Sequence, residues 1–254
     1  QFLYIVAEYY RFTKDREFLR RMYPTVRRVV EHIESLLAMR MTPEYQSEDK
    51  RAYYGLVPES ISHEGYSAKP MHSYWDCFFI ARGLRDASEI ARALGEDQEA
   101  DEFAALAAKF SRSLRASLEL TIQKHGIDYI PGCVELGDFD PTSTAIGIFP
   151  CAVTDDIPGQ ALERTFDRYM EFHRDRASGR KPWDAYTPYE IRIASALLMM
   201  GRRDQAHEIL GFFRQHLRPP GWLHWAEVVR RDPRQPGFIG DMPHTWVGSE
   251  FVKF

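Results

Sequence analysis

Cysteine is scarce in this sequence, and its spacing is not that of a disulfide or metal site. The 254 residues include three cysteines, Cys77, Cys133 and Cys151. An odd number without C-x-x-C spacing disfavours both a disulfide framework and a cysteine zinc site. Cys77 and Cys151 lie in apolar runs, so we expect them to pack as small hydrophobic side chains.

A large excess of charge and a long apolar run are also missing. The formal net charge is −4, and lysine and arginine are not clustered as a nucleic-acid partner would require. The most basic segment, RRMYPTVRRVV, has paired arginines between apolar positions, which is typical of a solvated helix face. Neither a signal peptide nor an apolar run that could span a bilayer is present. We expect a soluble protein with no membrane span; its compartment stays open, and a secreted or periplasmic parent protein is compatible with the sequence.

Several catalytic motifs are absent as well. The chain has no glycine-rich phosphate loop, no H-E-x-x-H pair and no G-x-S-x-G elbow. Carboxylates therefore remain as the main candidates for chemistry, and paired carboxylates are what glycoside cleavage requires. We expect no cofactor and no metal.

Helical periodicity dominates what is present. Apolar residues recur at helical spacing in segments that alternate between strongly apolar and amphipathic, as inner and outer layers of a helical ring would. The expected helices are residues 2–12, 15–39, 74–94, 98–123, 142–151, 158–175, 187–200 and 202–217, with a last one from about residue 243. We predict an all-α fold, a ring of helical hairpins, as one domain over residues 1–254.

Local signals refine these boundaries. Asp15 is placed to cap the second helix, and Pro24 to open its longer part. Gly95 is expected to end the helix that begins at Tyr74. The stretch TPYE predicts a capping box in which Glu190 reaches back over the helix start.

Long loops before the apolar helices collect aromatic, histidine and carboxylate residues. Residues 41–72 and 218–242 are the longest, and long loops in compact proteins are usually functional. Inner helices would bring these loops to one end of the ring. The result would be a cavity of aromatic faces and carboxylates, which suits sugars because their C–H faces stack on Trp and Tyr.

The main candidates also have ordinary structural interpretations. Ser73 and Asp76 fit the capping pattern [ST]-x-x-[DE], so Asp76 could simply favour the start of a helix. Glu227 could be an exposed residue of a short extended segment, and His244 a buried, hydrogen-bonded histidine. The tryptophans could be core residues.

Two stretches resemble known glycosidases. HSYWDCFF resembles the ESGWDFSSRW segment of trehalases and the DLWEE segment of glucoamylases. WLHWAEVVRRDPRQPGFIGDMPHTWVGSEF resembles the end of bacterial α-L-rhamnosidase domains, where a TTIWERW segment carries the general base and NHYAYG follows. All are six-hairpin (α/α) toroid enzymes. The resemblance implies that fold, as an incomplete ring because fewer helices are predicted, within a longer polypeptide that supplies the remainder.

The same resemblance implies an inverting pair of carboxylates. Asp76 matches the general acid, Glu227 the general base, and His244 the histidine that follows. Such a pair stands about 6.5–9.5 Å apart to leave room for a water. Trp75 could desolvate Asp76 and keep it protonated, whereas the helix start favours its anion. In rhamnosidases, however, the acid motif lies upstream of the part matched here, which would make Asp76 a binding residue or a cap.

A carbohydrate substrate is the expected partner. The side chains expected to bind it are aromatic, histidine or carboxylate residues of the loops: Glu59, His72, Tyr74, Trp75, Trp183, Tyr186, Trp225, His244 and Trp246. Two other functions remain open. A non-catalytic carbohydrate-binding or scaffold module would bind without turnover, and a glycoside phosphorylase would need a phosphate pocket.

Overall fold

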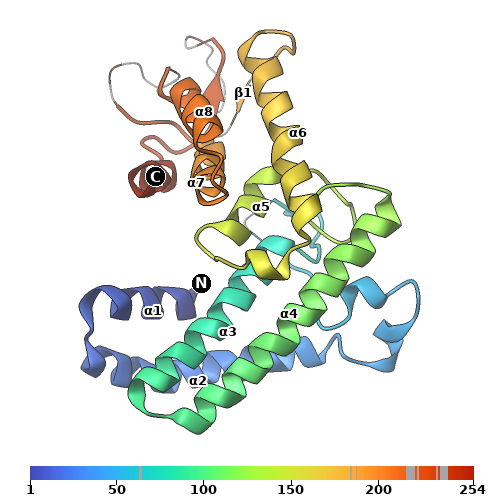
Figure 1. Ribbon diagram of the computed structural model, residues 1–254, viewed down its shortest axis with the longest axis vertical. Coiled ribbons are helices and arrows are strands. Elements are labelled where there is room, and N and C mark those ends of the chain that lie inside the picture. Colours follow the sequence, from blue (N-terminus) through green and yellow to red (C-terminus); the bar gives the residue numbers. More distant parts are fainter. Residues whose placement is uncertain are drawn as a thin grey trace. The chain divides into compact units, whose positions relative to one another are not determined.

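The chain is mostly helical in this computed structural model (Figure 1). The structure describes residues 1–62, 65–183, 185–186, 188–215, 221, 223–232, 234 and 240–254. The chain forms two compact units: residues 1–140 with 151–162, and residues 141–150 with 163–254. The single domain over residues 1–254 stays a prediction.

The first unit contains two helical hairpins and three short 3₁₀ turns. Its elements are α1 (Phe2–Thr13), α2 (Arg16–Ala38), η1 (Pro43–Gln46), η2 (Arg51–Tyr53), α3 (Tyr74–Leu94), α4 (Asp97–His125) and η3 (Thr154–Asp156). The long loop between α2 and α3 thus holds only the turns η1 and η2 as regular structure among its described residues.

The start of α2 follows the predicted capping signal. The Asp15 side chain accepts a hydrogen bond from the backbone N–H of Phe18 at 2.9 Å, which satisfies one of the free donors at a helix start. Pro24, however, does not open a helix, because α2 runs through it without interruption. Arg20 and Arg27 are exposed, as predicted for a solvated helix face.

The hairpin of α3 and α4 shows the predicted alternation between buried and amphipathic helices. The two long helices lie side by side (Figure 1), and Gly95 ends α3 with a positive φ of 88°. In α4, the buried residues recur every three or four positions, as in Phe103, Ala107 and Phe110. In α3, burial extends to most of the helix.

Helix α1 packs closely against α3 on one side only. A side chain at Gly83 of α3 would meet Leu3 of α1 at 3.3 Å, so glycine permits this close approach. The buried carboxylate of Asp86 accepts a hydrogen bond from Arg11 of α1 at 2.5 Å, which ties the two helices together, and another from Arg82 of its own helix at 2.9 Å. The prediction that α1 is a buried helix is wrong for its outer face, where Phe12 is 86% exposed.

The second unit repeats the helical hairpin plan. Its elements are α5 (Pro141–Ile148), most of α6 (Gly159–Ala177), β1 (Ala185–Tyr186), η4 (Pro188–Glu190), α7 (Ile191–Met199), α8 (Arg203–Gln215), β2 (Val229–Arg230) and α9 (Thr245–Lys253). The strands β1 and β2 pair antiparallel. The residues of α7 from Ile191 to Leu197 are buried without interruption, whereas α8 buries one face, including Ile209 and Phe213.

The capping box predicted at the start of α7 takes another form. Pro188 to Glu190 form the turn η4, and the α-helix begins at Ile191. The Glu190 carboxylate does not cap the helix but accepts hydrogen bonds from Tyr169 at 2.6 Å and from Arg176 at 2.8 Å. Glu190 is therefore bound by a buried arginine and a tyrosine hydroxyl on α6, and not by the backbone N–H groups at the start of α7.

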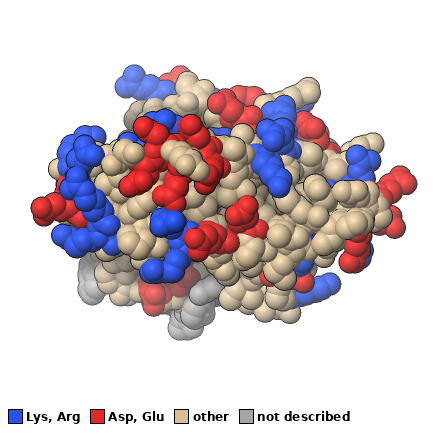
Figure 2. Space-filling model, turned by 90° about the horizontal axis from the view of Figure 1, so that it is seen from below, with Lys and Arg blue, Asp and Glu red and all other residues tan. Residues whose placement is uncertain are grey.

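The described surface mixes charges of both signs. Figure 2 shows lysine and arginine side chains interspersed with aspartate and glutamate over one face. Cys77 and Cys151 are buried as free thiols, which confirms that they pack as small apolar residues. Among the described residues, no helix combines the length and the apolar character that crossing a membrane requires.

Candidate functional site

Asp76 lies in the first turn of α3, under a loop that supplies serine hydroxyls. Ser60 Oγ donates to Asp76 Oδ2 at 2.5 Å, and Ser62 Oγ lies 3.4 Å from Oδ1. Ser73, the residue that precedes the helix, makes no capping bond with its side chain; Ser62 Oγ donates to its hydroxyl at 3.0 Å. The serine half of the predicted capping box is therefore not formed, and Asp76 belongs to a small hydroxyl–carboxylate cluster.

Backbone pairing fixes this serine loop above the helix start. Ser60 and Met71 form an isolated antiparallel bridge with two hydrogen bonds of 2.9 Å, and Ser73 bridges Cys133. Ser62 adopts a positive φ of 53°, and its backbone N–H donates to Ser60 Oγ at 2.9 Å. The loop geometry is thus set by contacts within the first unit.

A second polar group in this unit links Glu59 and His72 to two other side chains. Arg40 Nε donates to His72 Nε2 at 3.1 Å and its Nη2 binds the Glu59 carboxylate. Because Nε2 accepts, the neutral ring carries its proton on Nδ1, which lies 2.6 Å from Glu135 Oε1. Glu59 is about half exposed, with 48% of its side chain accessible, whereas Arg40 and His72 are buried. The buried side chain of Arg40 thus holds the accessible carboxylate of Glu59 in place.

The charges in this group favour ionised carboxylates. A backbone hydrogen bond and Arg40 lower the pKa of Glu59. Burial works to raise the pKa of Glu135, but hydrogen bonds from the side chain and the backbone N–H of His72 outweigh it and hold the pKa below its ordinary value. Both carboxylates are therefore acceptors, suited to sugar hydroxyls or to structural bonds rather than to proton donation at neutral pH.

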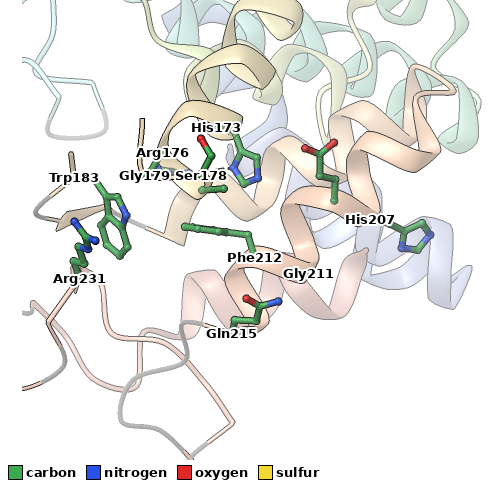
Figure 3. Close-up of a pocket in the computed structure, with 12 residues that line it drawn as sticks. His173, Arg176, Ser178, Gly179, Trp183, His207, Gly211, Phe212, Gln215 and Arg231 are labelled. Carbon is green, nitrogen blue, oxygen red and sulfur yellow. Dashed lines mark hydrogen bonds between the residues drawn. The ribbon is translucent and has the colours of Figure 1, made fainter. Parts of the chain in front are cut away.

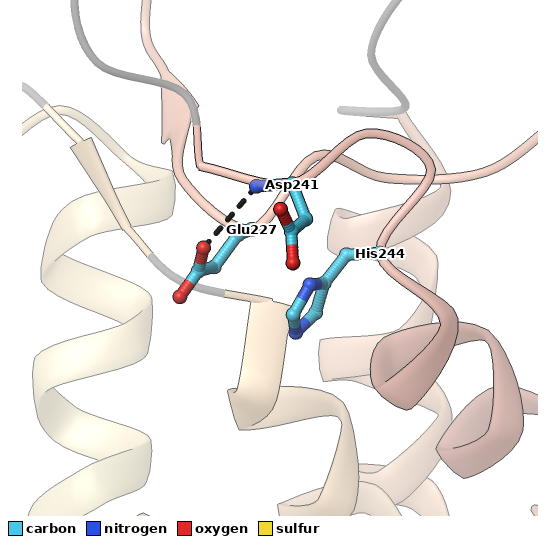
Figure 4. A group of neighbouring side chains, drawn as sticks. All are labelled: Glu227, Asp241 and His244. Atoms are coloured by element: carbon cyan, nitrogen blue, oxygen red, sulfur yellow. Dashed lines mark hydrogen bonds between the residues drawn. The ribbon is translucent and has the colours of Figure 1, made fainter. Parts of the chain in front are cut away.

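In the second unit, Glu227 lies beside Asp241 and His244 (Figure 4). The backbone N–H of Asp241 donates to Glu227 Oε2 at 3.2 Å, and the N–H of Glu227 donates to the Asp241 carbonyl at 3.0 Å. One ligand atom from each of the three side chains lies within 4.8 Å of the others. Such a set could hold a divalent cation or a water molecule next to two carboxylates.

An aromatic group adjoins this cluster at the start of α7. The Tyr189 hydroxyl and His244 Nε2 are 2.7 Å apart, and the two rings meet edge to face at 5.2 Å. Trp246 lies 6.2 Å from both rings and is 59% exposed. His244 is therefore a buried, hydrogen-bonded histidine that also lies beside two carboxylates, and its role in binding a sugar stays a prediction.

Trp183 lines a cavity of about 840 Å³ in the second unit (Figure 3). Its ring lies 6.2 Å from that of Phe212 on α8. Neither Glu227 nor His244 lines this cavity. The structure thus separates Trp183 from the carboxylate cluster with which the sequence grouped it.

Three of the predicted sugar-binding aromatic residues are buried. Tyr74 is fully buried, and its hydroxyl lies 2.8 Å from both Ser117 and Thr121 of α4, so it is a core residue. Trp225 is 2% exposed and donates through Nε1 to the Phe213 carbonyl. Trp75 is 6% exposed. The side chain of Tyr186 lies outside the described residues; its backbone belongs to β1.

Several residues of these groups were not predicted from the sequence. Asp241 stands in the GDMPHTW segment, from which His244 and Trp246 were selected but the aspartate was not. Tyr189 and Arg40 become part of the sites through contacts 55 and 32 residues away in the chain. Ser60 carries no motif, and only the fold brings it to Asp76.

The helical hairpins of this chain are consistent with part of a six-hairpin glycosidase domain. The model of the bacterial alpha-L-rhamnosidase six-hairpin glycosidase domain matches residues 2–130, just over half of the 254 residues. The chain belongs to this family. The matched range includes Asp76, whereas Glu227 lies beyond it. Comparison with curated proteins and with solved structures found no match.

Proposed function

We propose that this chain hydrolyses α-L-rhamnosides with inversion, using Glu227 as the general base and Asp76 as the general acid. The family supports this substrate class, because its description names an α-L-rhamnosidase domain. Inversion requires one carboxylate to activate a water while a carboxylic acid protonates the leaving oxygen.

The observation that carries the proposal is how Glu227 is held. A general base has to be fixed within hydrogen-bond reach of the water that it deprotonates. The Asp241 N–H donates to one of the Glu227 carboxylate oxygens, and the other oxygen accepts no hydrogen bond from the part of the chain that the structure describes. The Asp241 carboxylate and the His244 ring lie within 4.8 Å of the same carboxylate and supply polar partners for a bound water.

The test is turnover of p-nitrophenyl α-L-rhamnopyranoside, with the first-formed sugar followed by proton NMR. The proposal predicts release of nitrophenol with β-rhamnose as the initial product; an initial α-anomer would refute inversion. The same assay is run with a chelator, since the Glu227 group could also bind a cation. Equal rates are expected, because a carboxylate base needs no metal.

A non-catalytic carbohydrate-binding module is the second candidate, and one observation favours it. Ser60 donates to one oxygen of the Asp76 carboxylate and Ser62 lies beside the other, whereas a general acid has to present a proton to the leaving oxygen of the substrate. A binding module would retain rhamnoside affinity in the absence of any nitrophenol release, so the same experiment separates the two candidates.

A further inference from the structure

The cavity beside Trp183 lies in the unit that carries Glu227. The C-terminal end of α6, one face of α8 and Arg231 after β2 form its walls (Figure 3). Its volume of about 840 Å³ lies in the range of small-molecule sites. Glu227, Asp241 and His244 do not line it, so this cavity is separate from the proposed catalytic group.

A buried histidine presents a hydrogen-bond donor to this cavity. His173 is 1% exposed, and its Nδ1 accepts from Arg176 Nη2 at 3.3 Å. The neutral ring therefore carries its proton on Nε2. Within the described ranges, Nε2 has no hydrogen-bond partner. Burial, together with the adjacent Arg176 charge, lowers the pKa of His173 to about 4, so the ring stays a neutral Nε2–H donor at neutral pH.

The charges around the cavity leave one guanidinium available. Both terminal nitrogens of Arg176 donate to the Glu190 carboxylate, at 2.9 and 2.8 Å, and Arg174 binds Glu208. Arg231 is exposed and forms no ion pair with any described residue. Among the described residues, the lining therefore offers one guanidinium, that of Arg231, which forms no ion pair.

Aromatic rings supply the remaining part of a sugar site. Trp183 and Phe212 lie at an interplanar angle of 64°, so the wall presents two differently oriented apolar surfaces. A tryptophan surface binds the C–H face of a pyranose, whereas a bare inorganic anion gains nothing from it. A guanidinium forms strong, paired hydrogen bonds with a carboxylate.

We propose that this cavity binds an acidic sugar residue, a uronic acid. Its ring packs on Trp183, its carboxylate pairs with Arg231, and His173 Nε2–H donates to one of its oxygens. The pocket then selects rhamnosides that also contain a uronic acid. This selection rests on the proposed function, whereas the binding itself does not.

Calorimetric titration of the whole chain with glucuronic acid, and with glucose as the neutral match, tests the binding. The expected result is binding of glucuronic acid at least about tenfold tighter than glucose, with a loss of about tenfold in Arg231→Gln, as for one charge-assisted hydrogen bond. Glu227→Gln is expected to bind like the wild type. Trp183→Ala, checked for folding by circular dichroism, is expected to lose the binding of glucuronic acid.

Three results would overturn the site: no binding to the wild type, equal affinity for glucose and glucuronic acid, or unchanged affinity in a folded Arg231→Gln variant. Loss of binding in Glu227→Gln would place the ligand at the carboxylate group instead. The titration measures the binding of glucuronic acid whether or not the chain hydrolyses rhamnosides. Failure of the proposed function is therefore distinguished from failure of this binding site.

Selection of substrate is tested by turnover. The ratio of kcat/KM for a rhamnosyl-glucuronic acid disaccharide to that for the nitrophenyl rhamnoside is measured in wild type and Arg231→Gln. A fall of about tenfold in this ratio supports a substrate pocket, since the carboxylate pair is removed. An unchanged ratio contradicts it.

Discussion

Gly240 lies against Glu227 so closely that any side chain at position 240 would collide with it. A methyl group built on Gly240 would be 2.5 Å from Glu227 Cβ and 2.8 Å from Cδ. Gly240 also adopts a positive φ of 65°, which favours glycine. The absence of a side chain at this position is therefore a condition for the observed placement of the Glu227 carboxylate.

Gly240→Ala is expected to displace Glu227 and lower kcat by roughly 100-fold, the cost of moving a catalytic group by about 1 Å. Steady-state kinetics on the nitrophenyl rhamnoside measure the effect. Gly248→Ala is the matched control, because an added Cβ there meets no atom within 4 Å and its φ is not positive. If both variants keep wild-type kcat, the close contact has no role in catalysis.

Asp76→Asn is expected to lower turnover by about 10²–10⁴-fold on a poor leaving group such as methanol. On 2,4-dinitrophenyl rhamnoside the loss should be much smaller, since that leaving group departs without protonation. Comparing kcat for the two substrates checks this. A loss of equal size on both would assign Asp76 to binding, consistent with its serine partner.

Tyr74→Phe is expected to lower the free energy of unfolding by about 1–2 kcal/mol. The variant removes the hydroxyl that lies 2.8 Å from both Ser117 and Thr121 in the core. Urea unfolding followed by circular dichroism measures the change. An unfolding free energy equal to that of the wild type would contradict the placement of Tyr74 between α3 and α4.

His173 makes stability depend on pH in a defined window. The folded pKa is about 4, below the ordinary 6.5, so only the unfolded state gains a proton between these values. The stabilisation is fully present above pH 6.5 and is lost as pH falls towards 4, by an amount on the order of 3 kcal/mol. His173→Gln is expected to flatten the pH dependence of the unfolding free energy in this window. An unchanged slope would mean that His173 is not held neutral.

Local signals in the sequence predict the helices well but leave the side-chain environments open. Asp15 and Gly95 act at the helix ends where their chemistry places them, because capping involves neighbours within a few residues. Tyr74 and Asp76 stand two residues apart, yet one is fully buried and the other meets a serine loop. Which way each side chain points depends on α4 and on the loop, and the sequence pattern carries neither.

The sites themselves depend on contacts between distant segments. Arg40 reaches His72 and Tyr189 reaches His244 across long stretches of chain. Glu227 lies beside Asp241, which comes from a separate turn, and its role as a general base stays a prediction. Trp183 packs beside Phe212 of α8 and lines a cavity that Glu227 does not line. Composition cannot predict this packing contact.

The central claim is that Glu227 is the general base of a rhamnoside hydrolase, and Glu227→Gln tests it most directly. The amide keeps the size of the side chain but cannot accept the proton from water. Turnover of p-nitrophenyl α-L-rhamnopyranoside by wild type and variant is compared, with folding checked by circular dichroism. The account predicts an active wild type and a loss of about 10²–10⁴-fold in kcat for the variant. A folded variant that hydrolyses the substrate at the wild-type rate would contradict it.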